Sequence, residues 1–351
     1  MANIIGTTGD DTLVDLSGVN DMIWGDLQGT LLGLGGNDRI YGRSGDDMIY
    51  GDALSIGPDG RGGDDYLSGG AGDDRMFGDA TSTLYGIGGN DVLHQNGGQS
   101  FMSGDAIALA AGARGGDDKI YGAGQLYGDS ISSLTDAIGG DDLVDASQAT
   151  VACTIGGDGA GSIDGATMCG SDQLKGGASN DVVMGDSGGS MSGTSVGGHD
   201  RLWGNGGDDL LVGEVGGAIR DFARAGNDIL RGGAGNDQLF GDGGSLAGFA
   251  VGGKDKLYGG AGDDQLWGDG NVLDAATGGK DRFYFDGSFG DDTVNDFRQG
   301  EDKLVFTGYQ PGELQITVVG TDTVLTTLGD DSVTLKGFIG ALTYGTDILF
   351  A

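Results

Sequence analysis

The sequence predicts an all-β protein, a right-handed parallel β-solenoid or β-roll of about ten coils with a C-terminal β cap. Three observations predict it. Glycine pairs followed by x-Asp return about every 27 residues, a short x-aliphatic-x segment follows each glycine-rich turn, and 80 of the 351 residues are glycine. A fixed period indicates stacked repeats, each burying its apolar side chains against its neighbours. Without that period, such a glycine content would suggest disorder.

The repeat unit divides into three blocks of about nine residues. Residues 62–87 read GGDDYLSGG, AGDDRMFGD and ATSTLYGI, and only the first two blocks carry Gly-x-Asp-x-aliphatic. Glycine suits turns that need positive φ or a close backbone approach. Three blocks per coil keep every column in register, so we expect three short strands per coil. The alternative is a two-sided roll with the third block looped out.

The aliphatic residue two positions after each aspartate is the expected core, because stacked strands place these side chains in continuous columns. The first block supplies Ile40, Leu67, Leu93, Ile120, Val144, Leu174, Leu202, Leu230, Leu257 and Phe283. The second block supplies Ile49, Met76, Met102, Leu126, Val183, Leu211, Leu239, Leu266 and Val294.

Acidic residues form three further columns, which are the candidate metal ligands. The first aspartate ladder is Asp11, Asp38, Asp65, Asp91, Asp118, Asp142, Asp172, Asp200, Asp228, Asp255 and Asp281. The second aspartate ladder is Asp21, Asp47, Asp74, Asp181, Asp209, Asp237, Asp264 and Asp292, with Ser100 and Gln125 in its gap, where we expect fewer ions. The third acidic column either binds further ions or caps turns, and it is Asp26, Asp52, Asp79, Asp105, Asp129, Asp186, Glu214, Asp242 and Asp269.

Stacked carboxylates need counter-cations. Like charges about 5 Å apart repel by roughly 3 kcal/mol at an effective dielectric constant near 20. Ca²⁺ accepts mixed carboxylate and carbonyl ligands, whereas softer metals prefer His or Cys, of which the chain has two each. The 54 acidic residues against 18 basic ones give a net charge of -36, which argues against nucleic acid as a partner.

Three segments carry a known signature: GGAGDDRMF at 69–77, GGAGNDQLF at 232–240 and GGAGDDQLW at 259–267. They resemble the RTX nonapeptide GGxGxDxUx, and the resemblance extends from about residue 9 to 292. It implies multiple calcium ions between successive turns, held by aspartate carboxylates and loop carbonyls.

The last part of the chain differs. From residue 282 the strands are longer and glycines fewer, which resembles the closing segment of RTX exoproteins such as serralysins. We therefore expect a calcium-binding solenoid over 1–281 and a capping and secretion-signal segment over 282–351. The ending DILFA resembles that of type I secretion substrates, and the alternative is a simple final strand. With no signal-peptide pattern and no run of 18 apolar residues, we expect type I export to the exterior or cell surface and no membrane span.

Two smaller features are open. An aromatic column, expected to point outward, is either a self-stacking surface ladder or a contact stripe for a protein or glycan: Trp24, Tyr50, Phe77, Tyr127, Phe240 and Trp267. Cys153 and Cys169 either form a bridge or lie as small buried residues in one coil.

No catalytic motif stands out. HExxH is missing, and the GxSxG match at 193–197, near His199, lies in a third block with no helix in view. We expect a non-enzymatic, secreted calcium-binding protein with a structural, surface or self-assembling role. The alternatives are a calcium-dependent folding module of an exoenzyme and a glycan-binding adhesin module.

Overall fold

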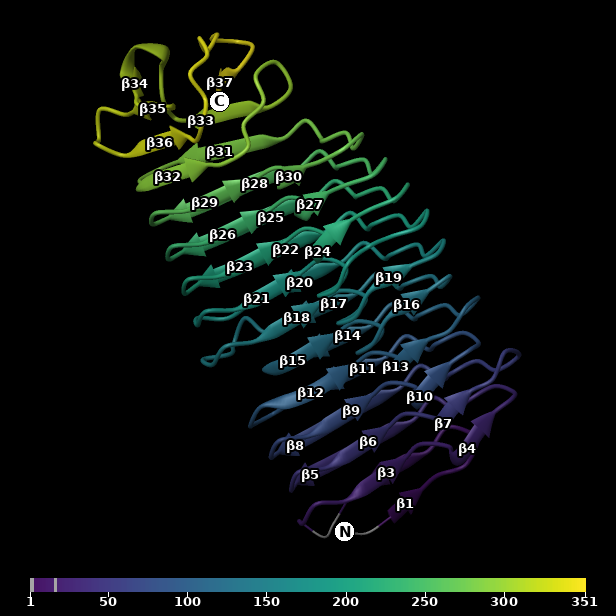
Figure 1. Ribbon diagram of the computed structural model, residues 1–351. Helices are drawn as coiled ribbons and strands as arrows, with labels where there is room; N and C mark the ends of the chain where they lie inside the picture. Colours follow the sequence, from purple (N-terminus) through teal and green to yellow (C-terminus); the bar gives the residue numbers. More distant parts are fainter. Residues whose placement is uncertain (1–2, 16–17) are drawn as a thin grey trace.

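The computed structural model describes residues 3–15 and 18–351 and shows coils stacked in one direction from the N-terminus to the C-terminus (Figure 1). Within the described residues the regular structure is β, apart from one 3₁₀ turn, η1 (Pro311–Glu313). A search for membrane-spanning helices in this part of the chain finds none that is long and apolar enough.

Most full coils contain three strands, one from each block, and the coil at 169–196 has single bridges at Ser187 and Met191 in place of its third strand. In one coil these are β8 (Tyr66–Ala71), β9 (Arg75–Phe77) and β10 (Ala80–Leu84). They pair in parallel with β5 (Arg39–Ser44), β6 (Met48–Tyr50) and β7 (Ala53–Ile56) of the preceding coil. The expectation of three strands per coil is therefore confirmed, and the third block is a paired element.

The first strands form one sheet and the second strands another. In spatial order, the first sheet also contains β2 (Thr12–Val14), β11 (Val92–His94), β14 (Lys119–Tyr121), β17 (Leu143–Asp145), β20 (Gln173–Lys175), β22 (Arg201–Gly206), β25 (Ile229–Ala234), β28 (Lys256–Ala261), β31 (Arg282–Asp286), β33 (Lys303–Thr307) and β37 (Ile348–Phe350). The second also contains β1 (Asn3–Ile5), β3 (Met22–Trp24), β12 (Ser100–Ser103), β15 (Gly124–Tyr127), β18 (Thr154–Gly156), β21 (Val182–Met184), β23 (Leu210–Val212), β26 (Gln238–Phe240), β29 (Gln265–Trp267), β32 (Asp291–Val294), β36 (Ser332–Leu335), β35 (Asp322–Thr326) and β34 (Gln315–Val319).

The third strands form a shorter, interrupted side. Its pieces are β4 (Leu27–Leu31) with β7, β10 and β13 (Ala106–Leu109), then β16 (Leu134–Thr135) with β19 (Ile163–Asp164), then β24 (Val215–Ile219) with β27 (Gly243–Leu246) and β30 (Asn271–Val272). Single bridges such as Ile163 to Met191 and Met191 to Ile219 continue the stacking between the pieces. The third side is therefore irregular because its sequence repeats least strictly.

The apolar interior is divided in two. Every residue of the two predicted core columns is fully buried, and Ile23 and Ile155 join them. Third-strand side chains such as Ile56, Leu84 and Leu246 pack in separate clusters, which the repeat pattern did not predict. Each coil therefore encloses one core between its first and second strands and another beneath its third strand.

The C-terminal end closes the stack differently. Strand β31 still pairs in parallel with β28 and β33, whereas β34, β35 and β36 pair antiparallel. Phe283, Phe285, Phe289 and Phe306 are buried together at this end. Large aromatic side chains thus fill the interior at this end of the stack.

Both cysteines are free thiols, so the bridge alternative does not hold. Cys153 is buried within the main core, and Cys169 is partly buried at the start of the next coil. The two residues therefore lie in successive coils, and only Cys153 is a buried core residue.

Candidate metal centres

The first aspartate ladder lies where each first strand begins. The backbone N–H of Asp65 donates to Oδ1 of Asp91 in the next coil at 2.7 Å, and Asp91 repeats this with Asp118 at 2.7 Å. The bonds run from Asp11 to Asp281 and end on Asp302, which sequence reasoning missed although it stands in the same Gly-x-Asp-x-aliphatic pattern. Each ladder carboxylate therefore uses one oxygen to hold its register.

The second oxygen of each buried ladder residue is left without a hydrogen-bond partner. This applies to Oδ2 of Asp38, Asp65, Asp91, Asp118, Asp142, Asp172, Asp200, Asp228, Asp255 and Asp281. Asp11 differs because its Oδ2 accepts hydrogen bonds from the N–H and hydroxyl of Thr7 at 2.6 and 2.8 Å. Buried polar atoms are almost always satisfied, so a whole column of orphaned carboxylate oxygens indicates missing ligand partners.

These free oxygens face backbone carbonyls. A Cβ added to Gly78, at the end of a second strand, would lie 1.8 Å from the Gly104 carbonyl oxygen and 1.9 Å from Asp91 Oδ2. The same pairing recurs at Gly51 and Gly128. A carbonyl oxygen and a carboxylate oxygen of the next coil therefore border one small space beside each of these glycines.

The third acidic column meets the first ladder from the other side. The N–H groups of Gly63 and Gly89 donate to the carboxylates of Asp52 and Asp79 at 3.0 and 3.1 Å. All nine predicted members of the column are buried. The end of each second strand thus touches the start of a first strand. We call the first ladder and the third column together the acidic seam, and it separates the two apolar interiors.

The seam resolves the two alternatives for the third column only in part. Its carboxylates do cap backbone N–H groups, but these lie ten to twelve residues along the chain, not in a local Asx turn. One oxygen each of Asp186, Glu214 and Asp242 still has no partner. Asp158 belongs to the same column and was missed, although the pair Gly157-Asp158 repeats the Gly-Asp pairs of the other coils.

The second aspartate ladder lies at the turns between first and second strands. Asp209 N–H donates to Asp237 Oδ1 at 2.8 Å, and a Cβ at Gly232 would lie 2.2 Å from Asp237 Oδ2 and 2.5 Å from the Gly259 carbonyl oxygen. In its turns Gly70 and Gly72 have φ of 102° and 139°, as the sequence predicted for glycine there. This ladder repeats the carboxylate-plus-carbonyl arrangement of the seam at the opposite end of the strands.

The donor set fits calcium. The orphaned atoms are carboxylate oxygens, their neighbours are carbonyl oxygens, and the spaces repeat between successive coils. Hard oxygen donors in a mixed set are what Ca²⁺ takes, whereas Mg²⁺ demands stricter octahedral geometry.

Comparison with known protein families agrees with calcium as the ion. A family model described as the RTX calcium-binding nonapeptide repeat (4 copies) matches residues 25–53, 59–82, 155–190, 196–217, 222–245 and 249–271. Over these segments the chain carries RTX calcium-binding nonapeptide repeats. Its RTX repeats imply multiple calcium ions, consistent with the buried aspartates of the turns.

Other comparisons add little. No curated protein matches the sequence. Among solved structures, the chain is similar to the extracellular lipase LipA from Serratia marcescens, with 21% identity, a TM-score of 0.23 and coverage of 54% of this chain. The match spans 40% of that lipase.

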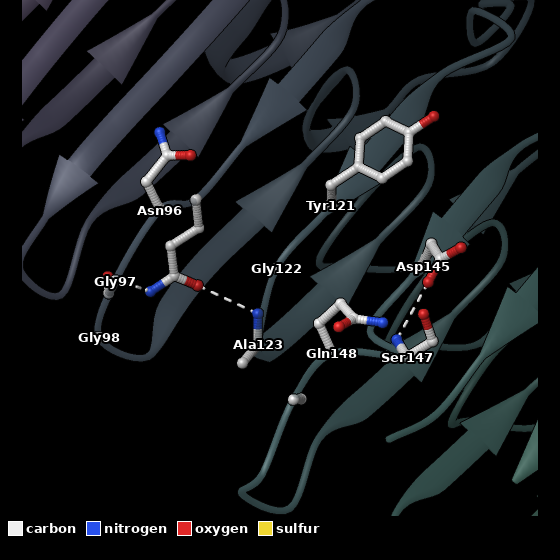
Figure 2. Close-up of a pocket in the computed structure, with 11 residues that line it drawn as sticks. Asn96, Gly97, Gly98, Tyr121, Gly122, Ala123, Asp145, Ser147 and Gln148 are labelled. Carbon is white, nitrogen blue, oxygen red and sulfur yellow. Dashed lines mark hydrogen bonds between the residues drawn. The ribbon is translucent and has the colours of Figure 1, made fainter. Parts of the chain in front are cut away.

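The interruption of the second ladder is visible between the RTX matches. Asp74 N–H donates to Ser100 Oγ at 3.0 Å, so a hydroxyl replaces the next carboxylate. In the following coils Gln95 Oε1 accepts from Ala123 N–H at 3.0 Å, and an open pocket lies among Tyr121, Asp145 and neighbouring turn residues (Figure 2). Neutral amide and hydroxyl groups here do what carboxylates do elsewhere, which supports the expectation of fewer ions.

An exposed column runs beside the first ladder and was not predicted. Asn37 N–H donates back to Asp10 Oδ1 at 3.1 Å, Asp64 N–H to Asn37 Oδ1 at 3.2 Å, and Asn90 N–H to Asp64 Oδ1 at 3.0 Å. These bonds run opposite to those of the ladder. Both Asn and Asp side-chain oxygens accept these bonds. The column therefore keeps successive coils in register and does not need a negative charge to do so.

The aromatic column stacks on itself. Trp24, Tyr50 and Phe77 are separated by 4.3 and 5.8 Å between ring centroids and form a buried cluster apart from the main core, partly covered by Met48 and Phe101. Phe240 and Trp267 stack at 4.3 Å and are only partly buried. The rings do lie outside the core, as expected, but the N-terminal ones are too buried to form an open contact stripe.

Burial raises the pKa of the buried carboxyls named here, and neighbouring carboxylates raise it further. The pKa of Asp47 is raised to about 6, that of Asp38 to about 7 and those of Asp281 and Asp292 to about 9. For Asp65 the pKa is raised well above its usual range. In each case the physical cause is first desolvation and then like charge.

Acid should therefore partly replace calcium. A carboxyl with a raised folded-state pKa favours folding fully below its unfolded value near 3.8, and this contribution is lost as the pH rises through about 6 for Asp47 and about 7 for Asp38. In EDTA we expect the circular dichroism signal of β structure to grow as the pH falls from 8 to 4. With saturating Ca²⁺ the same scan should stay flat above pH 6. Equal signals at pH 8 and pH 4 in EDTA would contradict the assignment.

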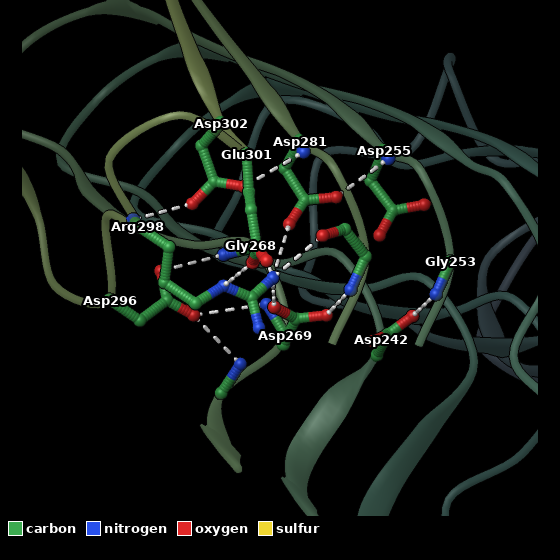
Figure 3. Close-up of polar contacts among 12 residues, drawn as sticks. Asp242, Gly253, Asp255, Gly268, Asp269, Asp281, Asp296, Arg298, Glu301 and Asp302 are labelled. Carbon is green, nitrogen blue, oxygen red and sulfur yellow. Dashed lines mark hydrogen bonds and ion pairs between the residues drawn. The ribbon is translucent and has the colours of Figure 1, made fainter. Parts of the chain in front are cut away.

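One cation of the chain itself enters the seam, at its C-terminal end (Figure 3). Arg298 forms ion pairs with Asp269, with Glu301 at 3.2 Å and with Asp302 at 3.9 Å. Its Nη2 also donates to the Gly279 carbonyl oxygen at 2.8 Å. Next to Gly278 the guanidinium occupies the space that a second carboxylate occupies next to Gly252. The last rung of the seam thus contains one fixed positive charge beside its carboxylates, whereas the inner rungs have no such group among the described residues.

The GxSxG match has no elbow geometry. Ser195 is fully buried, and its hydroxyl donates to the Gly165 carbonyl oxygen at 3.4 Å. The stretch lies in turns and a single bridge residue. A nucleophilic serine must be exposed on a strand–turn–helix bend, which this one is not.

Proposed function

We propose that this chain is a secreted, non-catalytic RTX protein that folds when it meets extracellular calcium and then serves a structural or self-assembling role at a surface. The orphaned buried carboxylate oxygens of both ladders carry the proposal, because they make the folded state dependent on added cations. The aspartates of the two ladders are the proposed ligands, with the third column completing the seam.

Export would rely on the same dependence of folding on calcium. In a cytosol poor in calcium the seam repels itself and the chain stays threadable, and binding outside drives folding. The proposed type I signal at 347–351 becomes part of the fold afterwards, because β37 pairs with β33 and buried Asp347 accepts the Gly300 N–H at 3.1 Å. Residues 282–351 would then act as both signal and cap.

Exposed apolar side chains support the self-assembling role. Phe222 and Phe249, 60% and 59% exposed, lie in the turns that follow the third strands of two successive coils, and Leu32, 69% exposed, follows the third strand of an early coil. The Phe222 and Phe249 rings stack at 5.2 Å and so present one flat apolar face. A second copy of the rod, with the same pair of rings, is a suitable partner for such a face.

Assembly is testable on the calcium-loaded protein. We expect electron microscopy and sedimentation to show laterally associated rods, and the double variant Phe222→Ser/Phe249→Ser to need at least a tenfold higher concentration to associate. The control Leu328→Ser removes an equally exposed side chain, 79% accessible, from the cap. A wild-type protein that stays monomeric at high concentration in calcium would reject self-assembly and favour the alternatives, an exoenzyme module or a glycan-binding adhesin.

A further inference from the structure

We call a rung of the acidic seam the side chains that two successive coils bring together there. One rung contains a thiol, that of Cys169. The first residue of the glycine pair faces the third acidic column in every coil, and it is glycine at 35, 62, 88, 115, 139, 197, 252 and 278. Cys169 and Ala225 are the two exceptions. Because a Cβ at Gly139 would meet the Asp158 carboxylate, a side chain in this column projects directly among the seam carboxylates.

At this rung three ligand groups converge. One ligand atom each from Asp158, Cys169 and Asp186 lie within 4.8 Å of one another, and within the described part of the chain no other three His, Cys, Asp or Glu residues come this close. Asp158 and Asp186 are fully buried, and one oxygen of each has no hydrogen-bond partner. These two unpartnered carboxylate oxygens indicate a bound ion independently of the Cys169 thiol.

The ligand atoms of this rung include a soft sulfur, whereas those of the other rungs are hard oxygens. Calcium binds oxygen ligands, and a thiolate is a poor ligand for it. A thiolate with two carboxylates instead suits Zn²⁺ or its heavier analogue Cd²⁺, which take sulfur at short distance and are content with three protein ligands and a fourth small ligand. A divalent ion offsets two of the three negative charges that the thiolate and the two carboxylates carry.

We propose that Asp158, Cys169 and Asp186 form a zinc-class site within the calcium-loaded seam. The inference rests on the proposed function, since the rung is assembled only when calcium has folded the adjoining coils. Zinc then binds at one position of the rod while calcium fills the others, and the ion joins the coil of Asp158 to the next coil, which contains Cys169 and Asp186.

The test uses the full chain folded in millimolar Ca²⁺. We expect equilibrium dialysis with Zn²⁺ to retain one zinc per chain against this calcium, and Cd²⁺ to give a sulfur-to-cadmium charge-transfer absorption. Cys169→Ala should lower zinc affinity at least a hundredfold and abolish the absorption. That variant should still fold, because Ala225 holds the equivalent position two coils later. Cys153→Ala removes the other thiol and should change neither reading.

The outcomes separate the two proposals. A chain that fails to fold in calcium, as judged by circular dichroism, would overturn the proposed function and this site with it. A calcium-folded chain that retains no zinc, or that retains it equally well as Cys169→Ala, would overturn the zinc site alone. A calcium-folding midpoint of Cys169→Ala equal to that of the wild type confirms that lost zinc reflects the ligand and not the fold.

Discussion

In EDTA at pH 7.5 the protein is expected to lose its parallel β structure, and millimolar Ca²⁺ is expected to restore it. Ladder carboxylates from successive coils stand about one strand spacing apart, and each such pair costs roughly 3 kcal/mol when bare at an effective dielectric constant near 20. A few uncompensated rungs therefore exceed the 5–15 kcal/mol stability of an ordinary domain. Far-ultraviolet circular dichroism during a calcium titration measures the transition directly.

The metal control is Mg²⁺ at equal concentration. It should support much less structure than Ca²⁺, because it resists the irregular carboxylate and carbonyl cages beside glycines such as Gly78 and Gly232. Hydrogen exchange at limiting calcium should leave the C-terminal end most protected, where Arg298 supplies charge and Phe283 and Phe306 supply an aromatic core. A full β spectrum in EDTA at neutral pH would refute calcium-coupled folding.

A single methyl group at Gly78 is expected to be among the most damaging small changes. The added Cβ would lie 1.8 Å from the Gly104 carbonyl oxygen and 1.9 Å from Asp91 Oδ2, so Gly78→Ala must displace both proposed calcium ligands. Overpacking against fixed backbone suggests a loss of about 2–4 kcal/mol in unfolding free energy measured in saturating calcium. Calorimetry should also show one or more ions lost.

The chain supplies a matched control for that variant. Gly206 pairs with Ala234 of the next coil, which pairs with Ala261, so alanine already occupies this column. A Cβ at Gly206 would meet only the Ala234 carbonyl oxygen at 3.8 Å. Gly206→Ala should therefore change stability by less than about 0.5 kcal/mol. Equal effects of the two substitutions would show that the space beside Gly78 is not a ligand site.

Much of this arrangement could be predicted from the sequence because the repeat is strict where the ladders are. A constant period fixes which residues stack, so the core positions from Ile40 to Phe283, and the aspartates that bond from coil to coil, followed from counting. The gap at Ser100 was predicted for the same reason. Asp158 was missed because the spacing in its coil is irregular, although its glycine neighbour marked it.

The sequence by itself determined the stacking and most members of the acidic columns, since these depend on period and residue type. It favoured three strands per coil over a two-sided roll, and the structure decided between them. Only the tertiary structure decided that the first ladder and the third column lie together as one buried seam between two apolar interiors, and that Arg298 and Cys169 enter it. The physical reason is that a constant period predicts which residues stack from one coil to the next. It does not predict which residues meet within one coil, because those contacts depend on how the weakly repeating third block packs.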